Sequence, residues 1–184
     1  MFKYVGDISK IAHYVIENFL ENKETAVDAT LGNGHDTDFL CEKFKKVYAF
    51  DIQECACRNY NNKKKDNVFV VNDSHEKLEE YVSENIDCII YNLGFLPGGK
   101  KEITTNHKSS LKSIKAALNL LKAGGIAAIS IYRGHAEGKI EEKYIIEYVK
   151  GLSKDEYGVM YHEFMNRSKD SPLLVIIEKR LNNV

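Results

Sequence analysis

Residues 27–37, "VDATLGNGHDT", join a short apolar run to a loop that contains Gly32 and Gly34. The run "TAVDA" predicts a buried strand that ends at Asp28. The two glycines let the backbone pass close to a ligand before a helix, which we expect to begin near His35. Any tight turn from a strand to a helix can use two glycines, so this loop alone is weak evidence for a nucleotide site.

Short apolar runs recur along the chain and alternate with segments of helical spacing. The runs are "KVYAF", "VFVV", "DCIIY" and "IAAISIY", and residues 109–122 form the clearest helical segment. Strands that alternate with helices predict a parallel sheet covered on both faces. Two final runs, "YGVMYHEFM" and "SPLLVIIEK", lack an intervening helical segment and predict an antiparallel hairpin. We therefore predict one doubly wound α/β domain over residues 1–184, with a mostly parallel seven-stranded sheet.

Two further helices are predicted at either end of this pattern. Residues 8–20 carry apolar side chains at helical spacing behind Asp7, which is a suitable N-cap. Another helix is expected after Gly138. Its inward-facing side chains are expected to be Ile140, Tyr144, Ile145 and Tyr148.

The composition excludes several classes of protein. The chain has 184 residues, 43% hydrophobic content and a formal net charge of -1, which suits a globular domain and not a broadly basic nucleic-acid coat. No stretch approaches a membrane span and the N-terminus lacks the apolar segment of a signal peptide, so we expect a cytoplasmic protein with no membrane partner. The four cysteines show no CxxC pair and no zinc-type spacing, so we expect reduced thiols and no metal.

Acidic residues follow three of the predicted strands. Asp51 ends the second strand, 17 residues after Gly34, where a carboxylate could accept both ribose hydroxyls of an adenosine. The third strand ends in "VVNDSH", which places Asp73 where it could accept from an adenine amino group. In a parallel sheet the carboxyl ends of the strands lie on one edge, near the switch in strand order. Three acidic strand ends in register therefore indicate a nucleotide-type cofactor.

The residues around the glycines indicate which nucleotide this is. A dinucleotide fingerprint would need a third glycine at Thr37, and no Walker lysine follows the loop. Asp28 and Asp36 flank the glycines, which suits a ligand with a cationic amino-acid end better than one with two phosphates. The cofactor implied is S-adenosylmethionine. An oxidoreductase that uses NAD is disfavoured by Thr37.

A family resemblance follows from five segments, "DATLGNGHDT", "AFDIQ", "NDSHE", "YNLGFLPGG" and "IYRGHAEGK". In order and spacing they resemble the small class I methyltransferases known as "putative rRNA methylases". Some members of that family methylate the aminomethyl group on the wobble uridine of tRNA. The resemblance covers nearly the whole chain. It implies a Rossmann-like class I methyltransferase domain, S-adenosylmethionine as cofactor and the anticodon region of tRNA as partner.

The resemblance also implies a set of cofactor-binding residues. Thr30 stands where many other methyltransferases have a first glycine, and a threonine is expected there in this family. The full set is Asp28, Thr30, Gly32, Asn33, Gly34, His35, Asp36, Thr37, Asp51, Gln53, Asp73, Ser74, His75 and Asn92.

The segment "NLGFLPGG", residues 92–99, occupies the place where amino-methylating enzymes carry an Asn-Pro-Pro-aromatic loop. Methyl transfer from a sulfonium is an in-line displacement, so the lone pair of the amine must point along the breaking bond. Asn92 can orient the amine through its side-chain oxygen. The alternative is that Asn92 is an ordinary turn residue without a role in catalysis. Phe95 or Leu96 could stack on a flipped base. The expected substrate-binding residues are Leu93, Gly94, Phe95, Leu96, Pro97, Lys100, Lys101 and Arg133.

The segment "YRGHAEG", residues 132–138, should lie at the same edge of the sheet. We expect Tyr132 and His135 to join Asn92 as catalytic residues; His135 either takes a proton from the ammonium product or organises the loop. Arg133 could meet a phosphate. The cations that could form a strip for RNA beside the pocket, or equally a solvated surface, are Lys100, Lys101, His107, Lys108, Lys112 and Lys115.

Two functions of different class follow from these patterns. The first is an S-adenosylmethionine-dependent methyltransferase that N-methylates the aminomethyl group of the wobble uridine in tRNA, with rRNA or a small-molecule amine as alternative substrates. The second is a non-catalytic subunit that binds the cofactor and acts with a partner. A complete "NLGFLPGG", residues 92–99, which we call the acceptor loop, favours the enzyme, because a binding module would not need such a loop. A homodimer is a candidate assembly.

Overall fold

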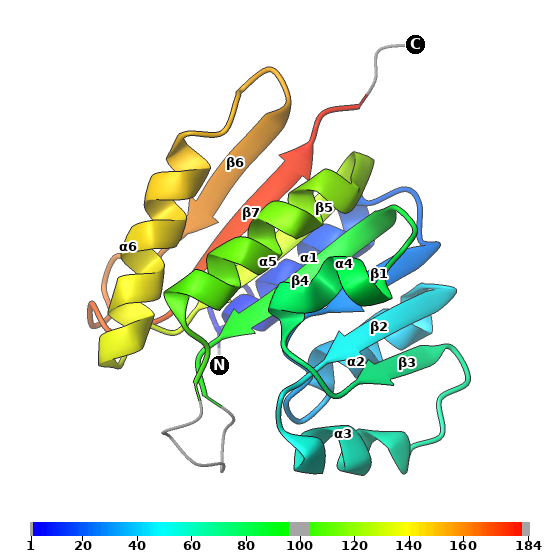
Figure 1. Ribbon diagram of the computed structural model, residues 1–184. Coiled ribbons are helices and arrows are strands. Elements are labelled where there is room, and N and C mark those ends of the chain that lie inside the picture. Colours follow the sequence, from blue (N-terminus) through cyan, green and yellow to red (C-terminus); the bar gives the residue numbers. More distant parts are fainter. Residues whose placement is uncertain (1, 96–103, 182–184) are drawn as a thin grey trace.

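The computed structural model describes residues 2–95 and 104–181, and these form a seven-stranded sheet in the order β3-β2-β1-β4-β5-β7-β6 (Figure 1). The pairs β3–β2, β2–β1, β1–β4 and β4–β5 are parallel, whereas β7 pairs antiparallel with both β5 and β6. The predicted fold class is confirmed. The strands are β1 Thr25–Asp28, β2 Lys46–Phe50, β3 Val68–Val71, β4 Ile86–Leu93, β5 Leu121–Ile131, β6 Tyr157–His162 and β7 Leu173–Lys179.

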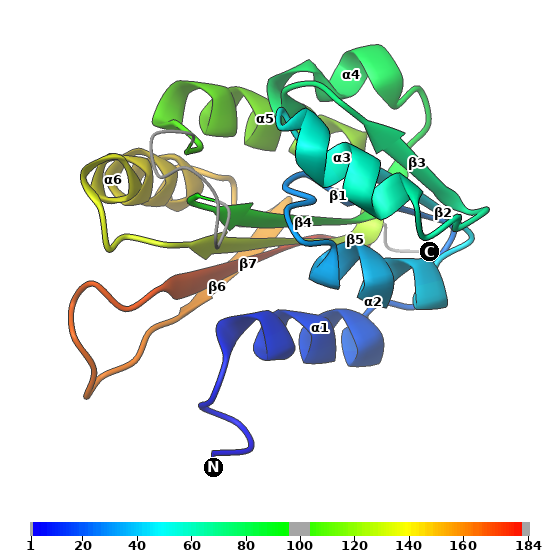
Figure 2. The same cartoon turned by 90° about the horizontal axis from the view of Figure 1, so that it is seen from below.

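Helices cover both faces of the sheet (Figure 2). α1 and α2 lie on one face, and α4, α5 and α6 lie on the other. A short 3-10 helix, η1, leads directly into α4. The helices are α1 Ile8–Phe19, α2 His35–Lys43, α3 Glu54–Asn61, η1 His75–Lys77, α4 Leu78–Tyr81, α5 His107–Leu120 and α6 Ala136–Lys150.

The first helix shows how the sequence specifies these elements. The side chain of Asp7 accepts from the backbone N–H of Ser9 at 3.0 Å, which satisfies one of the free donors at the helix start. The apolar stripe that includes Ile11, Ala12 and Ile16 is buried against the sheet. Burial of such side chains contributes about 1.5–3 kcal/mol for each large one. The predicted N-cap is observed, and the predicted apolar face is buried or half-buried except at Phe19, which is 67% exposed at the end of the helix.

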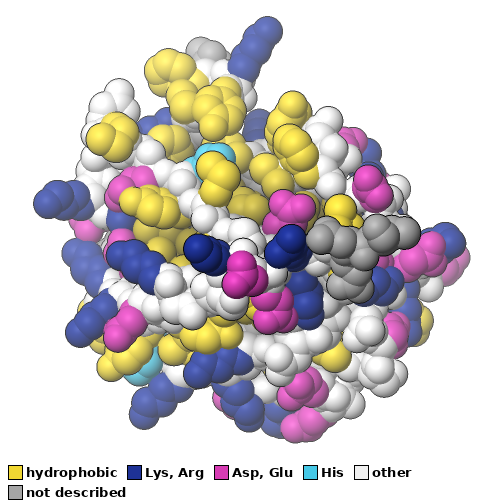
Figure 3. Space-filling model, turned by 90° about the horizontal axis from the view of Figure 1, so that it is seen from above, with side chains coloured by type: hydrophobic (Ala, Val, Ile, Leu, Met, Phe, Trp, Pro, Cys, Tyr) yellow, Lys and Arg dark blue, Asp and Glu magenta, His cyan; other side chains and the backbone are white. Residues whose placement is uncertain are grey.

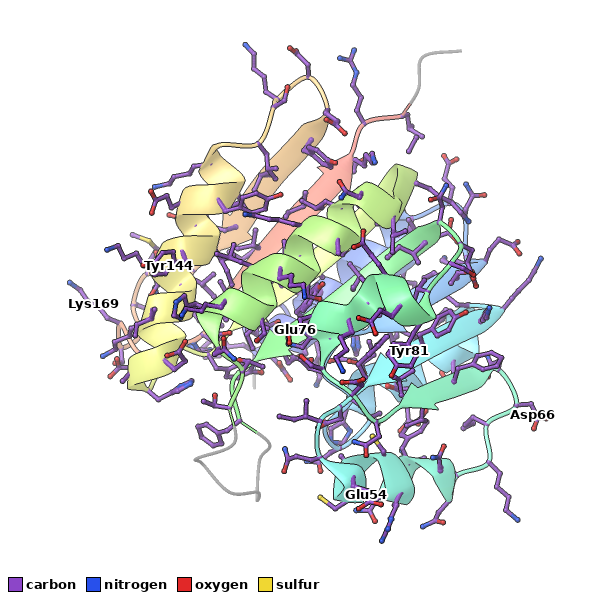
Figure 4. The ribbon with its side chains drawn as sticks, in the orientation of Figure 1. Glu54, Asp66, Glu76, Tyr81, Tyr144 and Lys169 are labelled. Carbon is purple, nitrogen blue, oxygen red and sulfur yellow. The ribbon has the colours of Figure 1, made fainter. Side chains whose placement is uncertain are left out.

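The predicted inward face of α6 is partly wrong. Ile140 and Tyr144 are 39% and 42% exposed, and the buried residues of the helix include Glu141 and Ile145. The reason is a polar contact: the carboxylate of Glu141 accepts from Thr105 Oγ1 at 2.8 Å and, at 2.6 Å, from a serine hydroxyl of α5. These bonds satisfy a buried carboxyl group, and they hold this face of the helix against α5. Tyr144 instead stacks on the ring of a histidine in α5 (Figure 4).

The surface of the protein carries charged side chains of both signs. On the face seen in Figure 3, Lys and Arg side chains are interspersed with Asp and Glu, in line with the formal net charge of -1. Within residues 2–95 and 104–181, no helix is both long enough and apolar enough to cross a membrane. All four cysteines are free thiols.

Candidate active site

The strand order reverses direction between β1 and β4. From β1 the chain builds outward to β2 and β3, and it then returns to place β4 on the other side of β1. Ligands of open α/β sheets bind beyond the carboxyl ends of the strands at such a switch. The loops that follow β1, β2, β3, β4 and β5 therefore define the candidate active site.

The loop after β1 is organised by Asp28, which is fully buried. Its Oδ1 accepts from the backbone N–H of Thr30 at 3.0 Å, and its Oδ2 accepts from Thr37 Oγ1 at 2.6 Å. Burial, together with repulsion from the nearby Asp36, raises the pKa of Asp28 to about 7. Asp28 therefore shapes the loop from within.

The two glycines of the loop adopt left-handed backbone conformations. Gly32 has φ 51° and Gly34 has φ 81°. A Cβ at Gly34 would lie 2.4 Å from the ring of Tyr60, a side chain of α3. α2 can therefore begin at His35 only with a glycine before it. Asn33 and His35 are exposed beside these glycines.

Asp51, just after β2, holds the glycine loop from the opposite side. Its Oδ2 accepts from the backbone N–H of Gly32 at 2.9 Å, and its Oδ1 accepts from the backbone N–H of Gln53 at 2.8 Å. Each oxygen of an ionised carboxylate can accept a second hydrogen bond. Asp51 therefore retains acceptors for two hydroxyl groups.

The segment after β3 is the third predicted strand end. The Oδ2 atom of Asp73 accepts from Lys77 Nζ at 2.9 Å and from the hydroxyl of Tyr81 at 2.8 Å (Figure 4). These bonds lower the pKa of Asp73 to about 2. The hydroxyl of Ser74 accepts from a backbone N–H of η1. Asp73 is thus ionised near neutral pH, with its carboxylate already engaged.

His75 lies beside Asp73 and is buried. Burial lowers its pKa to about 4, so the imidazole is neutral near pH 7. Its Nδ1 is buried and has no hydrogen-bond partner in the described part of the chain, and the ring meets Tyr91 edge-on, with centroids 5.9 Å apart. A buried, unpaired ring nitrogen is a position where a ligand can supply the missing partner.

Asn92 lies near the end of β4 and connects to the loop after β1. Its backbone N–H donates to Thr30 Oγ1 at 2.7 Å, and its side-chain Nδ2 donates to Asp36 Oδ2. The other carboxylate oxygen of Asp36 lies 2.5 Å from Nε2 of His13, a residue of α1. The side-chain oxygen of Asn92 is buried and has no hydrogen-bond partner within the described residues. Three elements thus meet at Asp36.

His13 is a residue of this cluster that the sequence analysis missed. No motif marks it, and it follows Ala12, whose side chain belongs to the buried stripe of α1. Its ring stacks on Phe39 of α2 with centroids 3.9 Å apart and an interplanar angle of 5°. Only the position of a histidine beside the apolar face of the first helix could have drawn attention to it.

The two predicted catalytic residues after β5 lie in different surroundings. Tyr132 is 38% exposed, and burial raises its pKa, which a hydrogen bond with Ser9 partly offsets. Gly94 lies directly beneath it, because a Cβ there would be 3.2 Å from the Cβ of Tyr132. The ring Nε2 of His135 is 3.1 Å from Thr104 Oγ1. Tyr132 therefore lies toward α1, and His135 lies toward the end of the acceptor loop.

The base of the acceptor loop is closed by backbone pairing. Phe95 and Thr104 form an antiparallel bridge, and the N–H of Thr105 donates to the carbonyl of Gly94 at 3.0 Å. The ring of Phe95 meets His135 edge-on, with centroids 5.7 Å apart. The contacts of His135 with both sides of this bridge favour the second of its two predicted roles, organisation of the loop.

Two of the predicted substrate-binding residues are corrected by the structure. Leu93 is fully buried in the core of the sheet, since the side chains of β4 alternate between its two covered faces. Arg133 is 7% exposed, and its guanidinium forms ion pairs at 2.6 Å with Glu142 and Glu163. It is therefore already neutralised and holds α6 to the segment after β6. Leu96, Pro97, Lys100 and Lys101 lie outside the described residues.

The comparisons with known proteins agree with this geometry. A family model described as "Putative rRNA methylase" matches residues 47–178. The chain belongs to this family. A relative from Arabidopsis thaliana, named tRNA (mnm(5)s(2)U34)-methyltransferase, chloroplastic, is 33% identical to it. That match covers 95% of this chain and 70% of the relative.

Two solved structures are similar to this chain over nearly its whole length. One, from Clostridium thermocellum and described as a "putative rRNA-methylase", has a TM-score of 0.89 and 31% identity over 97% of this chain and 99% of its own. Another, a "putative methyltransferase from streptococcus mutans in complex with SAH", has a TM-score of 0.86 and 36% identity with the same coverage of both chains. SAH is S-adenosylmethionine without its methyl group. At the level of family and fold, the predicted S-adenosylmethionine-dependent methyltransferase is confirmed.

The residues of this putative rRNA methylase fit that cofactor. Asp51 retains acceptors for two hydroxyls, and the segment after β3, which contains His75, follows a strand that runs parallel to β2. Asp28, expected to face the cationic amino-acid end together with Asp36, is fully buried, and both of its oxygens are hydrogen-bonded within the loop. Among the described residues, no cluster of three or more His, Cys, Asp or Glu side chains could hold a metal ion.

Proposed function

We propose that this protein N-methylates the aminomethyl group on the wobble uridine of tRNA, with S-adenosylmethionine as methyl donor. The name of the Arabidopsis thaliana relative, 33% identical, supports this substrate. The observation that carries the proposal is the side-chain oxygen of Asn92, a buried acceptor that lacks a partner within the described residues at the end of β4. An unpaired acceptor at the switch point suits a substrate that donates an N–H.

The residues that would hold the cofactor come from three strand ends. Asp51 would accept from the ribose hydroxyls, and the segment around Asp73 and His75 would border the adenine. Asp36 and the glycine loop would face the amino-acid end. When bound, S-adenosylmethionine supplies a methyl group carried by a positively charged sulfur.

Asn92 would orient the amine. An N–H of the neutral amine donates to Asn92 Oδ1, and this fixes the direction of the nitrogen lone pair. Formation of the new carbon–nitrogen bond would break the methyl–sulfur bond of the cofactor, release S-adenosylhomocysteine and leave a positive charge on the nitrogen, whose proton would then pass to water. The carboxylate of Asp36, which is hydrogen-bonded to the Asn92 side chain, places a negative charge near that developing positive charge. Together, the two side chains would supply orientation and electrostatic stabilisation.

The tRNA would approach along the acceptor loop and α5. Phe95 is 37% exposed at the base of the loop, where a base could stack on it. Lys108, Lys112 and Lys115 are exposed and recur at helical spacing on α5. Such a row can contact successive phosphates of an RNA backbone.

A methylation assay with defined tRNA tests the proposal. The purified protein is incubated with S-adenosylmethionine and tRNA that bears the unmethylated 5-aminomethyl-2-thiouridine, and the nucleosides are analysed by mass spectrometry. We expect conversion to the methylaminomethyl nucleoside. The matched substrate control is the same tRNA with an unmodified wobble uridine, which should gain no methyl group. Methylation of rRNA, or of both tRNAs equally, would contradict the proposed substrate.

The variant Asn92→Ala tests the role of the acceptor in the same assay. Loss of one acceptor lets the lone pair leave the line of transfer, so the single-turnover rate should fall by about 10²-fold or more. Affinity for S-adenosylmethionine should stay nearly unchanged. A normal single-turnover rate for this variant would mean that Asn92 only shapes the loop.

A further inference from the structure

We propose that His13 is a positioning residue for methyl transfer: it acts through Asp36 to hold the Asn92 amide with its oxygen facing the amine. This inference rests on the proposed function and names a residue outside the motifs of the loops. The contacts that carry it are the 2.5 Å distance between His13 Nε2 and Asp36 Oδ1 and the donation from Asn92 Nδ2 to Asp36 Oδ2.

The chemistry of the three side chains sets the direction of each hydrogen bond. An ionised carboxylate only accepts hydrogen bonds, so both groups that face Asp36 must donate. His13 must therefore carry a proton on Nε2, and Asn92 must turn its NH₂ group toward Asp36. The oxygen of the Asn92 amide then points the other way, where it is buried and without a partner in the described part of the chain.

One further contact restricts Asn92 so that a flip of its side-chain amide is the remaining movement to consider. The backbone N–H of Asn92 is fixed by Thr30 Oγ1 at 2.7 Å, so the main chain cannot move away. A flipped amide would place its oxygen against a carboxylate oxygen, which pairs two acceptors in a poorly hydrated site. Asp36 is 6% exposed, so water cannot easily relieve that repulsion. An ionised Asp36 therefore excludes the flipped amide.

His13 is what keeps Asp36 in that role. Donation from His13 Nε2 to one oxygen of Asp36 fixes the rotation of the carboxylate, so that its other oxygen faces the Asn92 amide. Without this contact the carboxylate could turn, and the amide would lose the acceptor that holds its NH₂ group. The stack of His13 on Phe39 fixes the ring in turn.

Two substitutions separate the hydrogen bond of His13 from its stacking. His13→Phe keeps an aromatic ring against Phe39 and removes the donor, whereas His13→Gln removes the ring and keeps an N–H donor. Single-turnover rates are measured on tRNA that bears the unmethylated aminomethyl group. We expect His13→Phe to slow methyl transfer by about 10- to 100-fold and His13→Gln to remain within about threefold of the unmodified protein. The reverse order, or equal rates, would overturn the inference.

A double variant asks whether His13 acts through Asn92. If it does, His13→Phe should slow the unmodified protein and leave the rate of Asn92→Ala unchanged, because the amide to be held is already absent. Independent effects that multiply would show that His13 acts elsewhere. Affinity for S-adenosylhomocysteine and the melting temperature are measured for each variant. A fall in rate that follows either quantity would assign His13 a structural role only.

The orientation of the Asn92 amide can be measured without an activity assay. In nuclear magnetic resonance spectra, the side-chain NH₂ of Asn92 should show one proton shifted downfield and slow to exchange, as expected beside a carboxylate. The signal should persist in His13→Gln and be lost in His13→Phe; if His13→Phe does not fold, His13→Ala replaces it. A signal unaffected by loss of the donor overturns the inference. A protein that fails to methylate this tRNA but shows the expected signals would refute the proposed substrate and leave the positioning of Asn92 intact.

Discussion

Substitution of Asp51 by alanine should weaken cofactor binding far more than it weakens the fold. In the structure the carboxylate accepts from the backbone N–H groups of Gly32 at 2.9 Å and Gln53 at 2.8 Å. Each such bond contributes about 0.5–1.5 kcal/mol to the free energy of unfolding. Both donors border a partly exposed loop, so water can replace part of that contribution. We expect a moderate loss of stability and a folded variant.

The loss of binding follows from the two remaining acceptor positions on Asp51. Hydrogen bonds from two ribose hydroxyls to a charged acceptor contribute about 1–3 kcal/mol together in a partly buried site. That free energy corresponds to an increase of about 5- to 150-fold in the dissociation constant. Asp51→Asn should give a smaller increase, because it retains one oxygen but turns an NH₂ group toward a backbone donor.

Isothermal titration calorimetry with three ligands tests this reasoning. S-adenosylhomocysteine and methylthioadenosine both carry the ribose, and adenine does not. Asp51→Ala should weaken the first two by the same factor and leave adenine unaffected. Asp66→Ala is a matched control, since it removes an exposed carboxylate between α3 and β3 (Figure 4). Unchanged affinity of Asp51→Ala for S-adenosylhomocysteine, or equal weakening of adenine, would refute the assignment of Asp51 to the ribose.

Two further predictions concern pH and salt. Because the folded protein raises the pKa of Asp28 from 3.8 to about 7, Asp28 stabilises the fold fully below pH 3.8, and this contribution is lost as the pH rises toward 7. Urea denaturation at stepped pH should therefore show Asp28→Asn gaining stability relative to the unmodified protein between pH 4 and 7; a constant difference would contradict this. If the lysines after the acceptor loop contact phosphates, methylation of tRNA should fall steeply with salt while cofactor affinity changes little, and the triple variant Lys100→Ala, Lys101→Ala and Lys108→Ala should flatten that dependence. An unaltered salt dependence would mean that these lysines only form part of the solvated surface.

The sheet could be predicted from the sequence because its signals are local. Each strand is a short apolar run, each is followed by polar residues or glycines, and the alternation with helices fixes the parallel arrangement. The acidic strand ends could be placed for the same reason, since a carboxylate that follows a buried strand must lie at the carboxyl edge. Asp28 and Asp51 accordingly meet the glycine loop from two sides.

Contacts between distant segments could not be predicted in this way. Arg133 was expected to meet a phosphate because a cation at the edge of the sheet suits one, but two glutamates from later segments neutralise it. The face of α6 was assigned from apolar spacing, and the hydrogen bonds of Glu141 override that spacing. In both cases a buried ionisable side chain is paired with residues of other segments. The periodicity of apolar residues along the chain carries no information about such pairs.

His13 and Asn92 show the same limit within the active site. Asn92 could be found because it stands at a strand end within a motif, yet its orientation depends on Asp36, a residue 56 positions earlier, and on a histidine of the first helix. Sequence reasoning placed an acceptor at the end of β4 without a reason for its oxygen to face away from Asp36. The structure supplies that reason, because an acceptor-only carboxylate must take the NH₂ of the amide. A methyltransferase that orients a neutral amine needs this acceptor fixed before the substrate arrives, since an amide free to flip would present a donor to the amine as readily as an acceptor.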